Sequence, residues 1–193
     1  LADVNYRYAD ATGLVTTDNE TSSRSVTIVD AETFDLRFKK NSNSPSSRGI
    51  DLTNAVNNET LVVTDVEARK GTDGFLDDAT VTLTTTGITG GDEDTRLDNF
   101  DDFIRSLSFV IDGTTIDTLS AGDAGVTSAS ANTFAFSFDL DEYEIEGGDD
   151  FRVEVRASFR AFAGPATVTV ASIVLTGEDM QDVAITGSHN TTY

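Results

Sequence analysis

The sequence predicts an all-β protein, an antiparallel β-sandwich of Ig-like or jelly-roll type with roughly ten strands and at most one short helix. Three observations support this prediction. Apolar and polar residues alternate along most of the chain, which is the period of a half-buried strand. Gly, Asp and Asn separate the alternating segments, as in the turns of sandwiches. Helical periodicity is confined to one stretch.

The strands can be followed in chain order. The first is expected at residues 3–8, where Val4, Tyr6 and Tyr8 alternate. The later strands are expected within residues 25–30, 33–40, 59–70, 78–86, 105–111, 115–119, 134–140, 151–159, 165–177 and 182–186. The dipeptide Asp112-Gly113 predicts a tight hairpin between two of them.

The stretch FAFSFDLDEYEIEGGDDFRVEVRASFRAF, residues 134–162, is the most regular part of the chain. Two alternating segments flank an acidic turn that contains Gly147 and Gly148, and glycine readily adopts positive φ. We therefore expect a hairpin. Its inward-facing residues should be Phe134, Phe136, Phe138, Val153, Val155 and Phe159.

Residues 96–107 are the one helical candidate, because Leu97, Phe100, Ile104 and Leu107 recur at helical spacing and Asp94 is placed to cap them. One or two turns are expected over the end of the sandwich. Residues 41–49 and 120–132 read as polar loops. The division predicted is an N-terminal arm at residues 1–23, with a polar link from residue 16, and a sandwich domain at residues 24–193. Since the first residue is Leu rather than Met, we expect a processed N-terminus.

The charge balance is strongly acidic: 13 Lys and Arg face 34 Asp and Glu, for a net charge of -21. Such a chain repels itself at low ionic strength, whereas molar salt shortens the screening length to ~3 Å. With so few Lys residues, the composition favours a protein of a halophilic microbe over a merely acidic surface protein. The same charge argues against binding nucleic acid or anionic membranes. There is no Cys, and no apolar run long enough for membrane insertion.

The segments SLSFVIDGTTIDT and FAFSFDLDEYEIEGGDDFRVEVRASF resemble the surface-exposed β-sandwich modules of prokaryotes. Those modules are similar to the Ig-like folds of cell-surface, S-layer and filament proteins. The resemblance covers roughly residues 59–162 and carries over no functional residues. It implies a binding or building role at the cell surface.

Candidate chemistry is sparse. His189 is the only histidine, and no phosphate loop, HExxH or GxSxG motif occurs, so we predict no enzymatic activity and no organic cofactor. Calcium is the one candidate ligand, since loops at sandwich ends can converge to supply its oxygens. One candidate cluster comprises Asp92, Glu93, Asp94, Asp98, Asp101 and Asp102, and a second Asp139, Asp141, Glu142, Asp149 and Asp150. The alternative is a hydrated acidic surface.

Three N-x-[ST] sequons begin at Asn19, Asn58 and Asn190, in segments predicted to be loops or tails. In a secreted protein such sequons accept glycans. We therefore expect these three asparagines to be candidate glycosylation sites.

These features predict an extracellular structural subunit that forms a homopolymer, either a pilus-like filament or a surface layer. In the mechanism expected, the arm adds a strand to the sheet of a neighbour and buries Val4, Tyr6 and Tyr8 there. The competing interpretation makes residues 3–8 the first strand of their own sandwich. Two other function classes stay open: a virion capsid, turret or spike protein, and a carbohydrate-binding adhesin module.

Overall fold

The computed structural model describes residues 6–9, 15–18, 35–47, 49–69, 73–87, 91–130, 132–180 and 182–190. The chain divides into two units, Leu1–Ala31 and Glu32–Tyr193, and each is described by itself. The predicted boundary after residue 23 falls in the segment 19–34, outside the described residues, and so does the strand predicted at 25–30.

The first unit contains a two-stranded antiparallel sheet of β1 (Tyr6–Ala9) and β2 (Val15–Asp18). Tyr6 pairs with Asp18 and Ala9 with Val15. β1 overlaps the strand predicted at 3–8, whereas β2 was not predicted, because residues from 16 onward were interpreted as a polar link. Within its own unit, β1 therefore has β2 as a partner strand.

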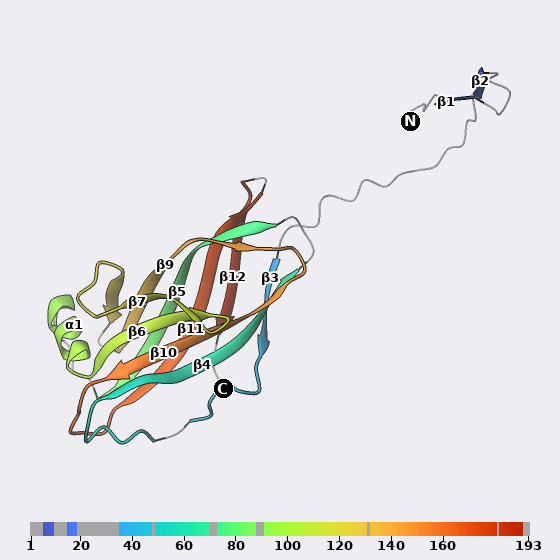
Figure 1. Ribbon diagram of the computed structural model, residues 1–193. Coiled ribbons are helices and arrows are strands. Elements are labelled where there is room, and N and C mark those ends of the chain that lie inside the picture. Colours follow the sequence, from blue (N-terminus) through green and yellow to red (C-terminus); the bar gives the residue numbers. More distant parts are fainter. Residues whose placement is uncertain are drawn as a thin grey trace. The chain divides into compact units, whose positions relative to one another are not determined.

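The second unit is an antiparallel sandwich of two five-stranded sheets, as predicted (Figure 1). The first sheet has the order β3 (Asp35–Lys40), β4 (Val56–Arg69), β10 (Asp150–Phe159), β6 (Ile104–Ile111) and β7 (Thr114–Leu119). The second has the order β12 (Ala184–Asn190), β11 (Thr167–Asp179), β5 (Gly74–Thr86), β9 (Thr133–Ile145) and β8 (Val126–Ser130).

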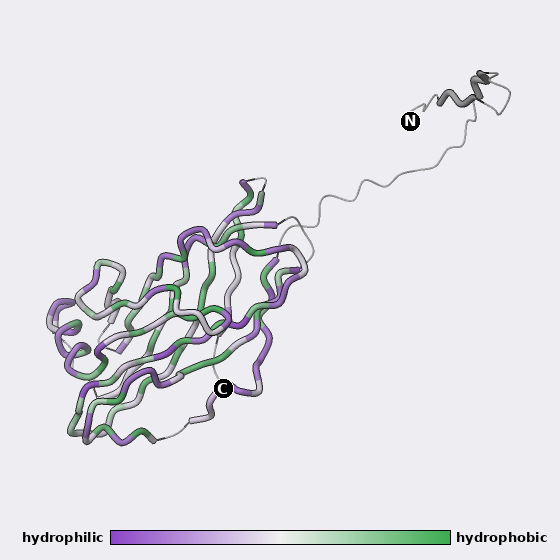
Figure 2. Tube along the Cα trace, viewed as in Figure 1, coloured by the Kyte–Doolittle hydropathy of each residue, from purple (hydrophilic) through white to green (hydrophobic). Residues whose placement is uncertain are grey.

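The core lies between the two sheets and is dominated by alternate residues of the central strands. Green and purple alternate along those strands in Figure 2, in keeping with one buried and one solvated face. The inward-facing set predicted from the sequence is confirmed: each of its members is at most 3% exposed, namely Phe134, Phe136, Phe138, Val153, Val155 and Phe159.

The hairpin at Asp112-Gly113 is confirmed: it joins β6 to β7, and both turn residues have positive φ, 47° and 81°. The hairpin predicted for residues 134–162 is wrong, because β9 and β10 lie in different sheets. β9 pairs with β5 and β8, while β10 pairs with β4 and β6. The turn crosses between the layers, with Gly148 at φ 100°, so the two apolar faces meet across the core. Alternation alone fixes which face is buried and leaves the neighbouring strand open.

The helix is shorter and earlier than predicted. α1 (Glu93–Asp101) is capped by Asp92 rather than Asp94, and Ile104 and Leu107 belong to β6. Phe100, buried on α1, packs against Phe134 with ring centroids 4.2 Å apart. A second correction concerns residues 120–132, predicted as a loop: they contain the edge strand β8, whose Val126 is buried.

The edges β3 and β12 pack against one another across the layers. Gly187 makes this close approach feasible, since a Cβ there would lie 2.6 Å from the Cβ of Leu36. β7 and β8 are the edges at the other side of the two sheets.

Candidate subunit-contact surfaces

The sandwich has a groove of about 1310 Å³, which we call the β4–β11 groove. Its walls come from residues 40–53, the N-terminal half of β4, residues 159–166 and the start of β11. Small-molecule pockets commonly measure roughly 300–1,000 Å³. The groove is therefore large enough for a peptide segment.

Strand pairing explains why the groove exists. β11 pairs with β5 from Thr167 to Asp179, but β12 pairs with β11 only from Ser172 to Glu178. The residues that follow Asn190 along β12, 191–193, lie outside the described residues. In the facing sheet, β3 pairs with β4 only at Thr64–Arg69. The N-terminal part of β4 therefore has no strand among the described residues on its outer side.

The floor of the groove is apolar and partly aromatic. Phe103 packs against Phe162, with ring centroids 4.9 Å apart, and against Phe159 at 5.5 Å. Val170 is buried and Val168 half-buried at the edge of β11. Covering an apolar surface of this kind with another chain removes it from water and therefore stabilises the contact.

A loop forms the outer wall. The Leu52 carbonyl accepts a hydrogen bond of 3.0 Å from the Phe162 N–H, and the Ser44 hydroxyl accepts one of 3.2 Å from the Val63 N–H. Residues 41–49 were predicted only as a polar loop. Sequence reasoning missed the groove because it forms where segments far apart in the chain meet.

The edge strand β8 is covered by α1. The Ser128 N–H donates a 2.9 Å hydrogen bond to Oε1 of Glu93, and Nη2 of Arg96 donates one of 2.9 Å to the Ser128 carbonyl. Side chains of the helix thus occupy backbone groups that a foreign strand would need. Covering an edge is a common protection against unwanted strand pairing.

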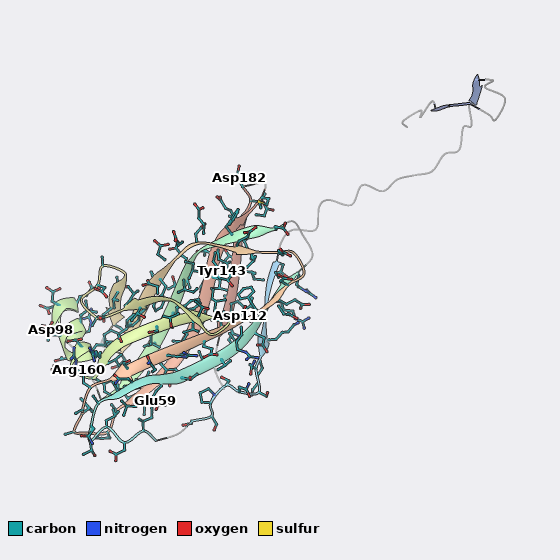
Figure 3. All side chains as sticks on the ribbon, viewed as in Figure 1. Glu59, Asp98, Asp112, Tyr143, Arg160 and Asp182 are labelled. Atoms are coloured by element: carbon teal, nitrogen blue, oxygen red, sulfur yellow. The ribbon has the colours of Figure 1, made fainter. Side chains whose placement is uncertain are left out.

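The first acidic cluster lies on and around α1, where Figure 3 marks Asp98 and Arg160. The carboxylate of Asp92 accepts bonds from the Thr95 hydroxyl, at 2.6 Å, and from its N–H, at 3.0 Å. These two hydrogen bonds lower the pKa of Asp92 below its ordinary value of 3.8. Asp101 accepts two bonds of 2.9 Å from Nη2 of Arg160.

Asp94, Asp98 and Asp102 belong to the same segment, Asp102 as the C-cap residue. In the described part of the chain, no three His, Cys, Asp or Glu side chains come together in a metal-binding arrangement. Calcium binding by this cluster stays a prediction.

The second acidic cluster is divided between the ends of β9 and β10 and the turn between them. Asp150 accepts a 3.2 Å hydrogen bond from Nζ of Lys39, which also pairs with Glu67 at 3.2 Å. These bonds, with that to Asp150 the larger, raise the pKa of Lys39 above 10.5. All three side chains are solvent-accessible, so such pairs contribute little to stability.

The predicted glycan acceptors are differently placed. Asn58 lies on β4, is exposed and has a φ of 57°. Asn190 is the last residue of β12, whereas Asn19 lies outside the described residues. The expectation that all three lie in loops or tails is therefore wrong for Asn58 and Asn190, while their modification stays a prediction.

Of the predicted subunit-contact residues, Tyr6 and Tyr8 lie on β1 and Val4 lies outside the described residues. His189 is part of β12, and its ring stacks on Phe38.

No family model matches the chain, and no curated protein matches it. Among solved structures, AvmM, which catalyses macrocyclization in alchivemycin A biosynthesis, matches at a TM-score of 0.41 and 10% identity, over 83% of this chain and 92% of that one. BcpA, the major pilin subunit of Bacillus cereus, matches at 0.27 and 10%, over 96% and 45%. ACE19, the collagen-binding subdomain of the Enterococcus faecalis surface protein ACE, matches at 0.25 and 11%, over 74% and 96%.

These neighbours include bacterial surface pilin and adhesin β-domains together with a biosynthetic protein, so they assign no function at such low similarity. The described residues also contain no helix with the length and apolar character that crossing a membrane requires.

Proposed function

We propose that this protein is a non-enzymatic structural subunit of an extracellular assembly, a surface filament or surface layer of a halophilic microbe, whose subunits join by β-strand addition. The observation that carries the proposal is the N-terminal sheet. It consists of two strands of four residues each, with four residue pairs. An isolated two-stranded sheet is marginally stable in water, so pairing with a further sheet would stabilise it.

The second unit contains a described hydrophobic core of its own. Every residue of the described hydrophobic core lies between Leu36 and Ile185. A neighbour's sandwich can therefore provide the missing partner without either body unfolding. Because donor and acceptor are different surfaces, the contact is heterologous and propagates along a fibre unless a ring closes.

The acidic composition supports a saline environment. The net charge of -21 opposes contact between identical subunits at low salt, and molar salt screens that repulsion. The proposal has the subunit assemble outside the cell, in the saline medium of a halophile.

Deletion of residues 1–17 tests strand addition. The truncated protein should keep the circular dichroism of the sandwich and remain monomeric in high salt, whereas the full chain should form polymers visible by negative-stain microscopy. A peptide of sequence LADVNYRYADATGLVTT should bind the truncated protein, and a scrambled peptide should not.

A second variant keeps the full chain. Tyr6→Asp combined with Tyr8→Asp should prevent polymerisation, because carboxylates would be buried without partners. The exposed pair Thr114→Asp and Thr115→Asp on β7 is the matched control and should still polymerise. Polymers that form without residues 1–17 would refute donation from this end, and closed trimers or pentamers of the wild type would favour a virion protein.

A further inference from the structure

We infer that the β4–β11 groove is the docking site of residues 191–193 of the same chain, which continue β12 and place the ring of Tyr193 on the apolar floor of the groove. This contact lies within a single subunit, so it is independent of the proposed function. It makes the segment after β12 a clasp that fills the space between the two sheets.

The described end of β12 lies beside the groove. Asn190 of β12 is opposite Ser172 of β11. In an antiparallel pair, the residues after Asn190 run toward the residues before Ser172. Val170, two residues before Ser172, lines the groove, as does Val168. A strand rises roughly 3.2–3.4 Å per residue, so residues 191–193 span about 10 Å and reach the groove without a loop.

The alternation along β12 indicates which side chains enter the groove. Ile185 and Gly187 are buried, and the residues beside them are exposed. His189, the next residue of this series, stacks on Phe38 of the facing sheet. Continued in steps of two residues, the series reaches Tyr193. The groove has one wall from each sheet, so a side chain on this face of β12 points into it.

The floor of the groove suits an aromatic ring. Phe103 packs against Phe162, and the half-buried Leu52 also lines the groove. The ring of Tyr193 would remove this apolar surface from water. Its hydroxyl would lie toward the polar loop wall, to which Ser44 belongs, as the hydroxyls of buried tyrosines commonly find a polar partner.

Other occupants fit the groove less well. Among its described lining residues, only Lys40 and Asp51 carry a charge, which gives a charged ligand little to pair with. A segment of a second copy would have to compete with residues 191–193, which β12 holds at the rim of the groove. Tethering of this kind gives an effective concentration on the order of mM. The chain's own segment is therefore the favoured occupant.

Nuclear Overhauser effects measured on the full chain test the contact directly. β11 is irregular at Ala171, which does not pair with β5, so the ring of Tyr193 is a better probe than a single cross-strand pair. We expect effects between the ring protons of Tyr193 and the methyl groups of Val168 or Val170. The sample is kept monomeric, as checked by analytical ultracentrifugation. The variants Tyr193→Phe, Val168→Ile and Val170→Ile assign the signals.

A matched pair of variants gives an independent readout. Tyr193→Ala should lower the melting temperature by at least about 2–4 °C, because the floor of the groove is then exposed to water. Thr192→Ala, one residue away on the opposite face of the strand, should leave the melting temperature nearly unchanged. Tyr193→Phe keeps the ring and should retain most of the melting temperature of the wild type.

Three results would overturn the inference. The first is a Tyr193 ring that shows no effect to either valine in the monomer. The second is an equal melting temperature for Tyr193→Ala and Thr192→Ala. The third comes from a mixture of copies labelled only at valine with copies labelled only at tyrosine: effects between the two would place the segment of a second copy in the groove. None of these results refutes strand addition, which the deletion of residues 1–17 tests separately.

Discussion

The rings of Phe38 and His189 stack in parallel, with centroids 5.5 Å apart and planes inclined by 7°. Phe38 lies on β3 and His189 on β12, so the contact joins the edge strands of the two sheets. Burial lowers the pKa of His189 below its ordinary value of 6.5. The stacked position therefore favours the neutral ring.

This lowered pKa predicts a pH dependence of stability. When the folded state binds its proton less readily than the unfolded state, stability is complete above pH 6.5 and is lost as the pH falls toward the folded-state pKa. Melting temperatures measured from pH 7.5 to pH 5 should decline. In His189→Phe, which keeps an aromatic ring on Phe38, the decline over this interval should be smaller. An unchanged slope in that variant would contradict this role of His189.

The centre of the core predicts a large cost for losing an aromatic ring. Phe136 is fully buried, with its ring centroid 5.6 Å from that of Phe100 and 6.3 Å from that of Phe138. Phe136→Ala should destabilise the fold by roughly 3–5 kcal/mol in chemical denaturation. Thr127→Ala, at an exposed position on the neighbouring strand β8, is the control and should have a small effect. A midpoint unchanged by Phe136→Ala would show that this residue does not face the core.

The structure leaves no room for a side chain at Gly177. It lies at an irregularity in the pairing of β11 with β5, and a Cβ there would lie 1.9 Å from the Phe75 carbonyl oxygen. Gly177→Ala should cost about 1–3 kcal/mol, because the two strands must separate locally. Gly122→Ala, where a Cβ meets no atom within 4 Å, should leave the melting temperature nearly unchanged. Equal effects of the two substitutions would be inconsistent with this close approach.

The hydrogen bond from Arg96 to the Ser128 carbonyl predicts that α1 protects the edge strand β8 from pairing with another chain. Removing its guanidinium in Arg96→Ala leaves the Ser128 carbonyl open on the β8 edge. We expect new association that survives deletion of residues 1–17, detected by analytical ultracentrifugation of the truncated protein. Arg105→Ala, at an exposed position on β6, is the control and should remain monomeric in the same background. Monomeric Arg96→Ala would indicate that the helix does not guard this edge.

The charge predicts a salt dependence. With a net charge of -21, melting temperature and polymer yield should both rise with NaCl, because the Debye length shortens from ~10 Å at 0.1 M to ~3 Å at 1 M. A series in NaCl at constant pH measures both quantities. A melting temperature that is flat or falls with salt would contradict adaptation to a saline environment.

The sequence by itself determined the fold class, most strand positions and the residues of the core. The reason is local: Phe134, Phe136 and Phe138 alternate, and alternation requires one buried face wherever the strand lies. Asp112-Gly113 likewise determined its hairpin, since the turn conformation is a property of those two residues. The net charge of -21 likewise follows from the composition alone.

Only the tertiary structure decided which strands are neighbours. β9 and β10 follow one another in the chain yet lie in different sheets, because a turn of suitable length can cross the core as readily as it can close a hairpin. The partner β2, the strand β8 and the cover that Arg96 and Glu93 provide depend on contacts between distant or weakly patterned segments. The β4–β11 groove belongs to the same class: its walls come from β4, β11 and the segments 40–53 and 159–166, and the alternation within a strand does not encode which distant segments pack beside it.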